Sequence, residues 1–168
     1  MKYLFSFLVL AIVLFSCSSD DDNGSDVQVL KIVVEYSGDI DSFEGMVLLS
    51  ADNGAEVLGS ENLVVPNVEQ NVYSTGYISI DDAQEFYSEG AETFMASFDV
   101  GLVDDVAGPL DVYLSANVSF YIDDALIAAT SFYVDNSDDG TNYFYYKLDA
   151  LLGKAYEFDT DAADWDEL

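Results

Sequence analysis

The sequence predicts an all-β fold, a single antiparallel β-sandwich of the immunoglobulin or a similar type, over residues 27–158. Apolar and polar residues alternate along most of this region, and clusters of Asp, Asn and Gly separate the alternating runs. Alternation of period two places one face of each strand in a core. A single sheet would leave this apolar face in water, so about eight to ten short strands should form two packed sheets.

The first half of this region contains five strand-like runs, which turn signals interrupt. The runs are residues 30–36, 46–51, 55–58, 63–65 and 72–80. The pair Asn53-Gly54 favours a tight turn because both residues adopt positive φ easily, and Pro66 favours a strand end or a sheet edge. Residues 81–87 predict one or two helical turns, with Asp81 as the N-cap.

The second half contains three longer runs whose even-numbered residues are mostly apolar. These runs are residues 94–102, 112–122 and 143–148. A loop of residues 123–125 would pair Ile122 with Leu126 and keep the even positions of the following strand inward. Residues 159–168 then predict an acidic C-terminal tail. Trp165 has no place in the alternating pattern, so we expect either a docked C-terminal anchor or an indole free on the surface.

Residues 1–16 have the features of a signal peptide that is removed from the mature protein. Lys2 supplies a positive charge, and residues 3–15 form an apolar run that is shorter than the roughly 20 residues of a membrane-spanning helix. The segment Leu14-Phe15-Ser16-Cys17 resembles the lipobox of bacterial lipoproteins, in which the cysteine is acylated and becomes the mature N-terminus. This resemblance implies that Cys17 is the lipidation site. The alternative is an ordinary secretory peptide followed by an unrelated cysteine.

Residues 17–26 form a polar, acidic tether that buries too little apolar surface to order itself. The residues that follow Cys17 resemble the export signal of Bacteroidota surface lipoproteins: Ser18, Ser19, Asp20, Asp21 and Asp22. The resemblance covers only the first 26 residues and implies a destination, a lipid-anchored protein on the outer face of the outer membrane. Two or more acyl chains would make this membrane attachment stable.

The composition excludes several classes of function. The 168 residues include 33 acidic residues, four lysines and no histidine, for a formal net charge of −29. Nucleic-acid binding needs Lys and Arg to neutralise phosphates, and a histidine-based triad or zinc site is impossible. A pair of carboxylates acting as acid and base, as in a glycoside hydrolase, is the remaining enzymatic alternative. We favour a protein that is not an enzyme, because no catalytic motif is present.

Five tyrosines at outward positions of the second half are candidate binding residues: Tyr113, Tyr121, Tyr133, Tyr143 and Tyr145. On adjacent strands they would form an exposed aromatic ladder that stacks on sugar faces or anchors a protein partner. The alternative is that these rings only support their sheet through cross-strand contacts.

The segment from Asp135 to Asn142 resembles the start of a calcium loop. Asp135, Ser137 and Asp139 supply oxygen ligands at its first, third and fifth positions, and Gly140 stands at the sixth. An EF-hand is excluded because its twelfth position would be Tyr146 instead of a bidentate Glu. The segment therefore predicts either a weak calcium site or a solvated hairpin loop.

These observations favour an outer-membrane surface lipoprotein that acts as a non-enzymatic binding or assembly module. The expected partner is an envelope protein complex, of which this protein would be an accessory subunit. Glycan binding through the tyrosine face is the first alternative, and a small carboxylate-dependent hydrolase is the second.

Overall fold

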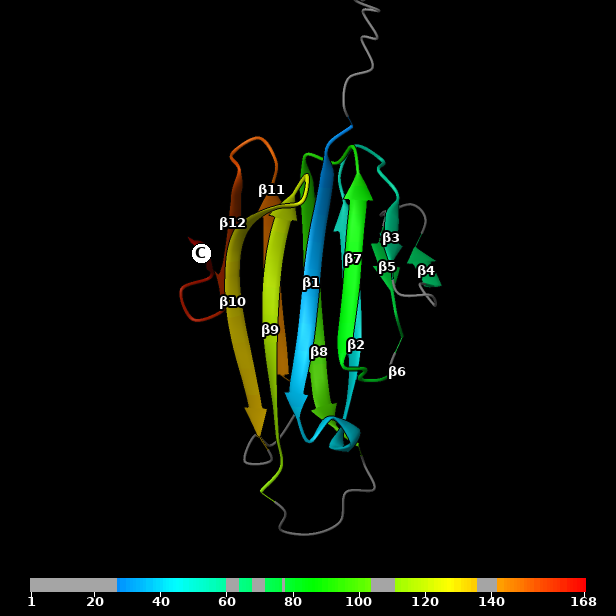
Figure 1. The fold of residues 1–168 in the computed structure, drawn as a ribbon, viewed down its shortest axis with the longest axis vertical. Helices are drawn as coiled ribbons and strands as arrows, with labels where there is room; N and C mark the ends of the chain where they lie inside the picture. The colour runs from blue at the N-terminus through cyan, green and yellow to red at the C-terminus, as the bar shows by residue number, and fades with distance from the viewer. Residues whose placement is uncertain (1–26, 60–63, 68–71, 77, 104–110, 136–141) are drawn as a thin grey trace, which may run out of the picture.

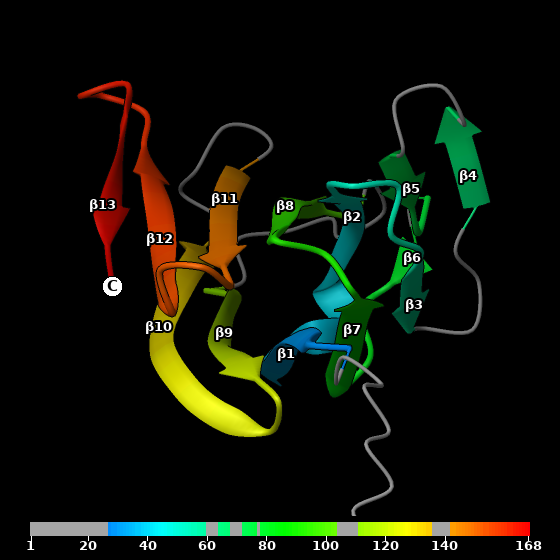
Figure 2. The same cartoon turned by 90° about the horizontal axis from the view of Figure 1, so that it is seen from above.

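The computed structural model describes residues 27–59, 64–67, 72–76, 78–103, 111–135 and 142–168. In this part of the chain two antiparallel sheets pack face to face (Figures 1 and 2). The expected all-β sandwich is therefore confirmed. Within the described ranges, no helix has the length and apolarity that a membrane crossing requires.

The described residues form thirteen strands and one 3-10 helix, η2. In chain order they are β1 (Val29–Gly38), η2 (Ile40–Ser42), β2 (Phe43–Ala51), β3 (Val57–Gly59), β4 (Val64–Asn67), β5 (Val72–Ser74), β6 (Ile78–Ser79), β7 (Ala83–Glu89), β8 (Thr93–Leu102), β9 (Tyr113–Ile122), β10 (Ala125–Asp135), β11 (Asn142–Asp149), β12 (Lys154–Asp159) and β13 (Asp164–Glu167).

Sheet A has the strand order β10-β9-β1-β7-β3, and sheet B has the order β13-β12-β11-β8-β2-β5-β4, with β6 beside β2. The pairs β1 and β2, β7 and β8, and β10 and β11 each join one sheet to the other. Strands that are neighbours within a sheet are therefore often far apart in the sequence, as the colours of Figure 1 show.

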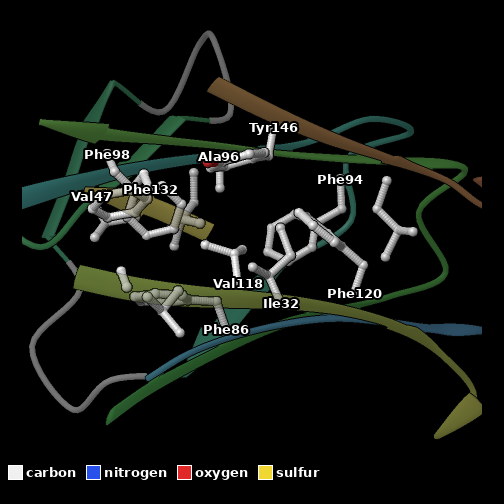
Figure 3. Close-up of a cluster of buried hydrophobic side chains, with 14 of the residues drawn as sticks. Ile32, Val47, Phe86, Phe94, Ala96, Phe98, Val118, Phe120, Phe132 and Tyr146 are labelled. Atoms are coloured by element: carbon white, nitrogen blue, oxygen red, sulfur yellow. The ribbon is translucent and has the colours of Figure 1, made fainter. Parts of the chain in front are cut away.

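The core lies between the sheets and consists of their inward positions. On β9, Val118 and Phe120 have no exposed surface, and in Figure 3 they face Phe94 and Tyr146 of sheet B. The rings of Phe120 and Tyr146 are 5.6 Å apart between centroids and join the two layers. The expected inward set of even-numbered residues is correct here, because burial of these apolar side chains is the main stabilising contribution.

Residues 81–87 are not helical, which corrects the expectation of a helical turn. Ala83–Glu89 form β7, a strand between β1 and β3 in sheet A. Gln84, Phe86 and Ser88 are buried at alternating positions. This two-residue period, supported by hydrogen bonds to strands on both sides, outweighs the single capping signal of Asp81.

The turn after β9 also differs from the expectation. Asp123 and Asp124 both have positive φ, 49° and 63°, as in the two-residue turns that suit the twist of a hairpin. Ile122 therefore pairs with Ala125 rather than with Leu126, and a bulge before Ala128 shifts the register. The bulge returns the even-numbered positions of the distal half of β10 to the core, while Leu126 stays 59% exposed.

The sandwich continues past residue 158, where an acidic tail was expected. β13 pairs with β12, and Trp165 lies opposite Phe158 with 5.2 Å between ring centroids. The backbone N–H of Leu168 donates a hydrogen bond to the carbonyl of Ala155 at 3.0 Å. Trp165 is thus docked and only partly exposed. The pattern missed this strand because its stabilising contacts come from β12 rather than from its own acidic sequence.

Candidate functional site

An apolar groove of about 430 Å³ lies on the outer face of sheet B. Its apolar and aromatic lining side chains that are not part of the buried core come from six different strands: Leu48, Val72, Met95, Tyr145, Phe158 and Trp165. In Figure 2 the outermost strands β13 and β4 both project away from sheet A, on either side of β8 and β2. The lining residues run from Trp165 on β13 to Val72 on β5, and β11, β8 and β2 lie between them.

The register of sheet B brings these residues into rows across the strands. Trp165 pairs with Phe158, Tyr145 pairs with Ser97, and Ser97 pairs with Leu48. Directly paired residues lie on the same face of a sheet. Residues that are more than a hundred positions apart in the sequence, such as Leu48 and Trp165, therefore line one surface.

Aromatic contacts build the wall of the groove at β12 and β13. The rings of Tyr145 and Phe158 meet edge to face with 6.1 Å between centroids, and Phe158 meets Trp165 in the same way at 5.2 Å. Edge-to-face contacts are favourable because the positive edge of one ring meets the negative face of the other. The wall is thus held by three side chains that support one another.

The charges around the groove differ from those of the whole protein. Among the described residues that line the groove none is acidic, although 33 of the 168 residues are Asp or Glu. Lys147 pairs with Met95 across β11 and β8. Its Nζ lies 4.4 Å from the ring centroid of Tyr156 and 4.9 Å from that of Trp165. Lys147 therefore places a positive charge at the edge of the groove.

The other two described lysines bond to carboxylates. Lys31 lies 3.2 Å from Asp124 and 3.7 Å from Glu85, and Lys154 bonds to Glu167. The hydrogen bond that Lys31 donates to Asp124 raises the pKa of Lys31, and the one that Lys154 donates to Glu167 raises the pKa of Lys154. Lys147 has no carboxylate within 4.0 Å among the residues that the structure describes.

Two carboxylates lie at the back of the β12–β13 wall, on the inward side. Glu157 pairs with Tyr146 on one side and with Asp166 on the other. Partial burial raises the pKa of Glu157, the negative charge of Asp166 raises it further, and the Tyr146 hydroxyl opposes this shift. Burial also raises the pKa of Tyr146, and the neighbouring Glu157 adds to that effect. The wall therefore contains one acid whose ionised form is disfavoured.

The five candidate tyrosines do not form one ladder, so that expectation is wrong. Tyr113 and Tyr133 stack on sheet A at 5.8 Å, and Tyr143 and Tyr145 stack on sheet B at 6.4 Å. Tyr121 lies on sheet A beneath Lys31, whose Nζ is 4.9 Å from its ring centroid. Sequence alternation predicted that the rings point outward but not that the chain changes sheet between β10 and β11.

The calcium candidates are only partly within the described residues. Asp135 ends β10 and is half-buried, whereas Ser137 and Asp139 lie outside the described residues. In the described ranges no three acidic or cysteine side chains gather as a metal site. The lipidation site Cys17 and the export residues 18–22 also lie outside the described residues.

Sequence reasoning missed most of the groove and identified only Tyr145. Met95, at an outward position of β8 and 38% exposed, was the available signal. A large apolar residue on the wet face of a strand is informative when others are its neighbours. Its neighbours Leu48 and Trp165 become visible only from the strand pairing.

Comparisons with known proteins agree with this fold. The family model PLCC, described as PLAT/LH2 and C2-like Ca2+-binding lipoprotein, matches residues 1–144. A crystal structure of a DUF4425 domain of unknown function from Bacteroides vulgatus ATCC 8482 is 21% identical, with a TM-score of 0.52 over 73% of this chain and 94% of that one. A DUF4425 family protein from Bacteroides ovatus ATCC 8483 is 18% identical, with a TM-score of 0.51 over 74% of this chain and 96% of that one.

A third solved structure is the calcium-bound form of a protein from Parabacteroides distasonis. It is 24% identical, with a TM-score of 0.48 over 75% of this chain and 98% of that one. No curated protein matches the sequence. The two DUF4425 structures share the fold of this chain, and the family model covers most of its length.

Proposed function

This chain belongs to the PLCC family of PLAT/LH2 and C2-like Ca2+-binding lipoproteins, and on that premise we propose that it is a surface lipoprotein that binds an apolar ligand in the groove of sheet B. The groove is the observation that carries the proposal. Its volume of about 430 Å³ lies within the range of small-molecule sites, which are mostly apolar with a few polar groups. The protein acts as a binding module rather than as an enzyme, since the described lining residues offer hydroxyl groups but no acid or base.

The lipid anchor and the outward orientation are part of the proposal. The family match starts at residue 1 and includes Cys17, and the acidic residues Asp20, Asp21 and Asp22 follow directly. Acylated Cys17 would hold the protein on the outer membrane, and the tether would let the sandwich face the exterior. An envelope protein that delivers or receives the ligand is the proposed partner.

The groove is tested with octanol as a neutral apolar probe. Trp165 is the single tryptophan of the chain, so its fluorescence reports directly on occupancy of the groove. We expect saturable binding to the full chain carrying Cys17→Ser. Met95→Glu should weaken the binding by about tenfold or more, because a carboxylate in an apolar groove must lose its hydration.

The matched control is Asn117→Glu, which adds the same charge at an exposed position of β9 on the outer face of sheet A. It should bind octanol like the parent protein. Equal loss in both variants, or no saturable change for the parent, would contradict the groove as the binding site. The partner is sought by pull-down of the tagged, lipidated protein, with Met95→Glu as the negative control.

The anchor is tested by membrane fractionation. Cys17→Ser should release the protein from the membrane, and its unchanged retention would contradict lipidation. Replacing Asp20, Asp21 and Asp22 by Ala should reduce digestion by protease added to intact cells while leaving membrane association unchanged. Equal digestion of both forms would show that the acidic run is only a spacer.

Calcium is the metal that the family description names. The described residues by themselves do not fit a calcium site, because no three suitable acids gather among them. The loop after β10 therefore remains our proposed site, with Asp135, Ser137 and Asp139 as weak ligands. Calcium bound there would supply charge neutralisation to an acidic loop.

Glycan binding is a second candidate, which one observation favours. Tyr113 and Tyr133 are 44% and 57% exposed and stack with an angle of 18° between ring planes. Such a pair offers flat apolar surface with hydroxyl groups beside it. Loss of oligosaccharide binding in Tyr133→Ala, with octanol binding unchanged, would support this second site.

A further inference from the structure

We infer that the ligand of the groove is a small amphipathic monoanion, an alkyl or aryl body that ends in one carboxylate or sulfonate, and that Lys147 binds its charged end. This inference rests on the proposed function of the groove. It adds the charge of the ligand and the residue that recognises it.

The position of Lys147 supports the inference first. Lys147 pairs with Met95, and its Nζ lies 4.9 Å from the ring centroid of Trp165. Both partners line the groove. A ligand whose apolar body contacts Met95 and Trp165 therefore has its end close to this ammonium group.

The hydrogen-bonding state of Lys147 is the second support. An ammonium group has three N–H donors, and the contacts found for Lys147 in the described part of the chain are with the faces of Tyr156 and Trp165. Aromatic faces stabilise the charge, but they do not provide the strong acceptor oxygens that a carboxylate or sulfonate has. An anion at the groove edge would supply those acceptors.

Nearby acids are engaged elsewhere. The carboxylate of Glu167 bonds to Lys154, and Asp149 accepts a hydrogen bond from the backbone N–H of Leu152 at 2.9 Å. In a chain with a net charge of −29, a lysine without a carboxylate neighbour among the described residues lies beside a groove that no described acid lines. The positive charge of Lys147 attracts an anionic ligand at the groove, although the net negative charge of the protein repels it at longer range.

The sequence offers a matched control for Lys147. Lys31 also lies over a tyrosine ring, with its Nζ 4.9 Å from the centroid of Tyr121, but on sheet A and with Asp124 and Glu85 as partners. Lys31→Met and Lys147→Met therefore remove the same charge and the same kind of ring contact from opposite faces of the sandwich.

The experiment compares octanoate with octanol by Trp165 fluorescence, in the full chain carrying Cys17→Ser. We expect octanoate to bind about fivefold more tightly than octanol, which is the scale of a partly exposed ion pair. Lys147→Met should abolish this preference and keep the affinity for octanol, whereas Lys31→Met should behave like the parent protein. Lys147→Gln, measured with a thermal unfolding control, replaces Lys147→Met if that variant does not fold.

Each outcome decides a different claim. Equal affinities of the parent for octanoate and octanol, or a preference that persists in Lys147→Met, would overturn the anionic ligand while leaving the groove as a binding site. Failure of both probes to bind the parent protein would overturn the groove itself. Loss of the preference in Lys31→Met as well would show a general effect of charge and would also overturn the role of Lys147.

Discussion

The two outer faces of the sandwich arise from the same alternation of residues but have different chemistry. The outer face of sheet A carries serine, asparagine and tyrosine, and its Lys31 is paired with Asp124 and Glu85. The outer face of sheet B has an apolar groove that no described acid lines, and the Nζ of its Lys147 lies over the rings of Tyr156 and Trp165. The inward residues therefore stabilise the fold of both sheets, whereas the outward residues determine which face can bind a ligand.

The largest expected effect compares the two sides of sheet A itself. Phe120 has no exposed surface, so Phe120→Ala should reduce the free energy of unfolding by about 3 to 5 kcal/mol through lost burial and a cavity. Tyr121 is half-buried on the outer face, and Tyr121→Ala should cost only about 1 kcal/mol in cross-strand contact. Denaturant unfolding measures both. Similar losses would mean that the outer face of sheet A is covered.

A smaller effect compares the outer faces directly. Trp165→Ala removes a ring pair with Phe158 and the contact with Lys147, which together should cost about 2 kcal/mol. Tyr133→Ala removes the pair with Tyr113 and should cost about 1 kcal/mol. Thermal unfolding tests the order of the two values. A larger loss for Tyr133→Ala would show that sheet A has the more tightly packed outer face.

The loop after Asp135 joins β10 of sheet A to β11 of sheet B. If calcium binds in this loop as proposed, it should stabilise the connection between the two sheets. A site with a dissociation constant of about 1 mM would add about 1.4 kcal/mol at 10 mM calcium. The melting temperature should therefore rise more in calcium than in magnesium or in sodium chloride of equal ionic strength, which controls for screening. If Asp139→Asn keeps the whole calcium increment, this loop is not the site.

The smallest effect concerns the acid behind the groove wall. The pKa of Glu157 is raised in the folded protein, so the fold is more stable when Glu157 is protonated. This stabilisation is fully present below the pKa that Glu157 has in the unfolded chain, and it is lost as the pH rises through its folded pKa. Glu157→Gln should therefore stabilise the protein at pH 7, by less than about 1 kcal/mol because the carboxylate is partly solvated.

This gain should shrink as the pH falls towards the pKa of an unperturbed glutamate. Glu89→Gln, at an exposed position of sheet A, controls for the loss of one negative charge. Unfolding curves at several pH values provide the measurement. A gain that is equal for both variants at every pH would assign it to net charge instead of to the wall.

The inward set of the sandwich was predictable because each inward residue carries its own signal. On β9 the even positions from Leu114 to Phe120 are all buried as expected, since alternation needs no knowledge of the neighbouring strand. The sequence reasoning failed at residues 81–87, where Asp81 as a candidate N-cap predicted helical turns although Gln84, Phe86 and Ser88 are buried at alternating positions. It failed again at β13, whose strand exists because Phe158 and Trp165 pack together.

Most residues of the candidate site could not be predicted from the sequence. The tyrosines were correctly expected on outward positions, but Tyr113 and Tyr145 lie on different sheets. Met95 and Lys147 are two of many outward residues, and only the pairing of β8 with β11 shows that they lie side by side. Whether Cys17 is acylated, and whether Asp139 binds calcium, stay predictions.

The sequence by itself determined that this chain is a β-sandwich and most of the side chains that enter its core, because successive residues of a regular strand point to opposite faces. Only the tertiary structure decided that Leu48, Met95, Tyr145 and Trp165 share one surface. Strand order and register depend on contacts between segments far apart in the chain, and a bulge or a change of sheet alters them without altering the local pattern. The groove exists because this register places its residues side by side. Each of them is an outward residue, and no sequence signal marks them as a group.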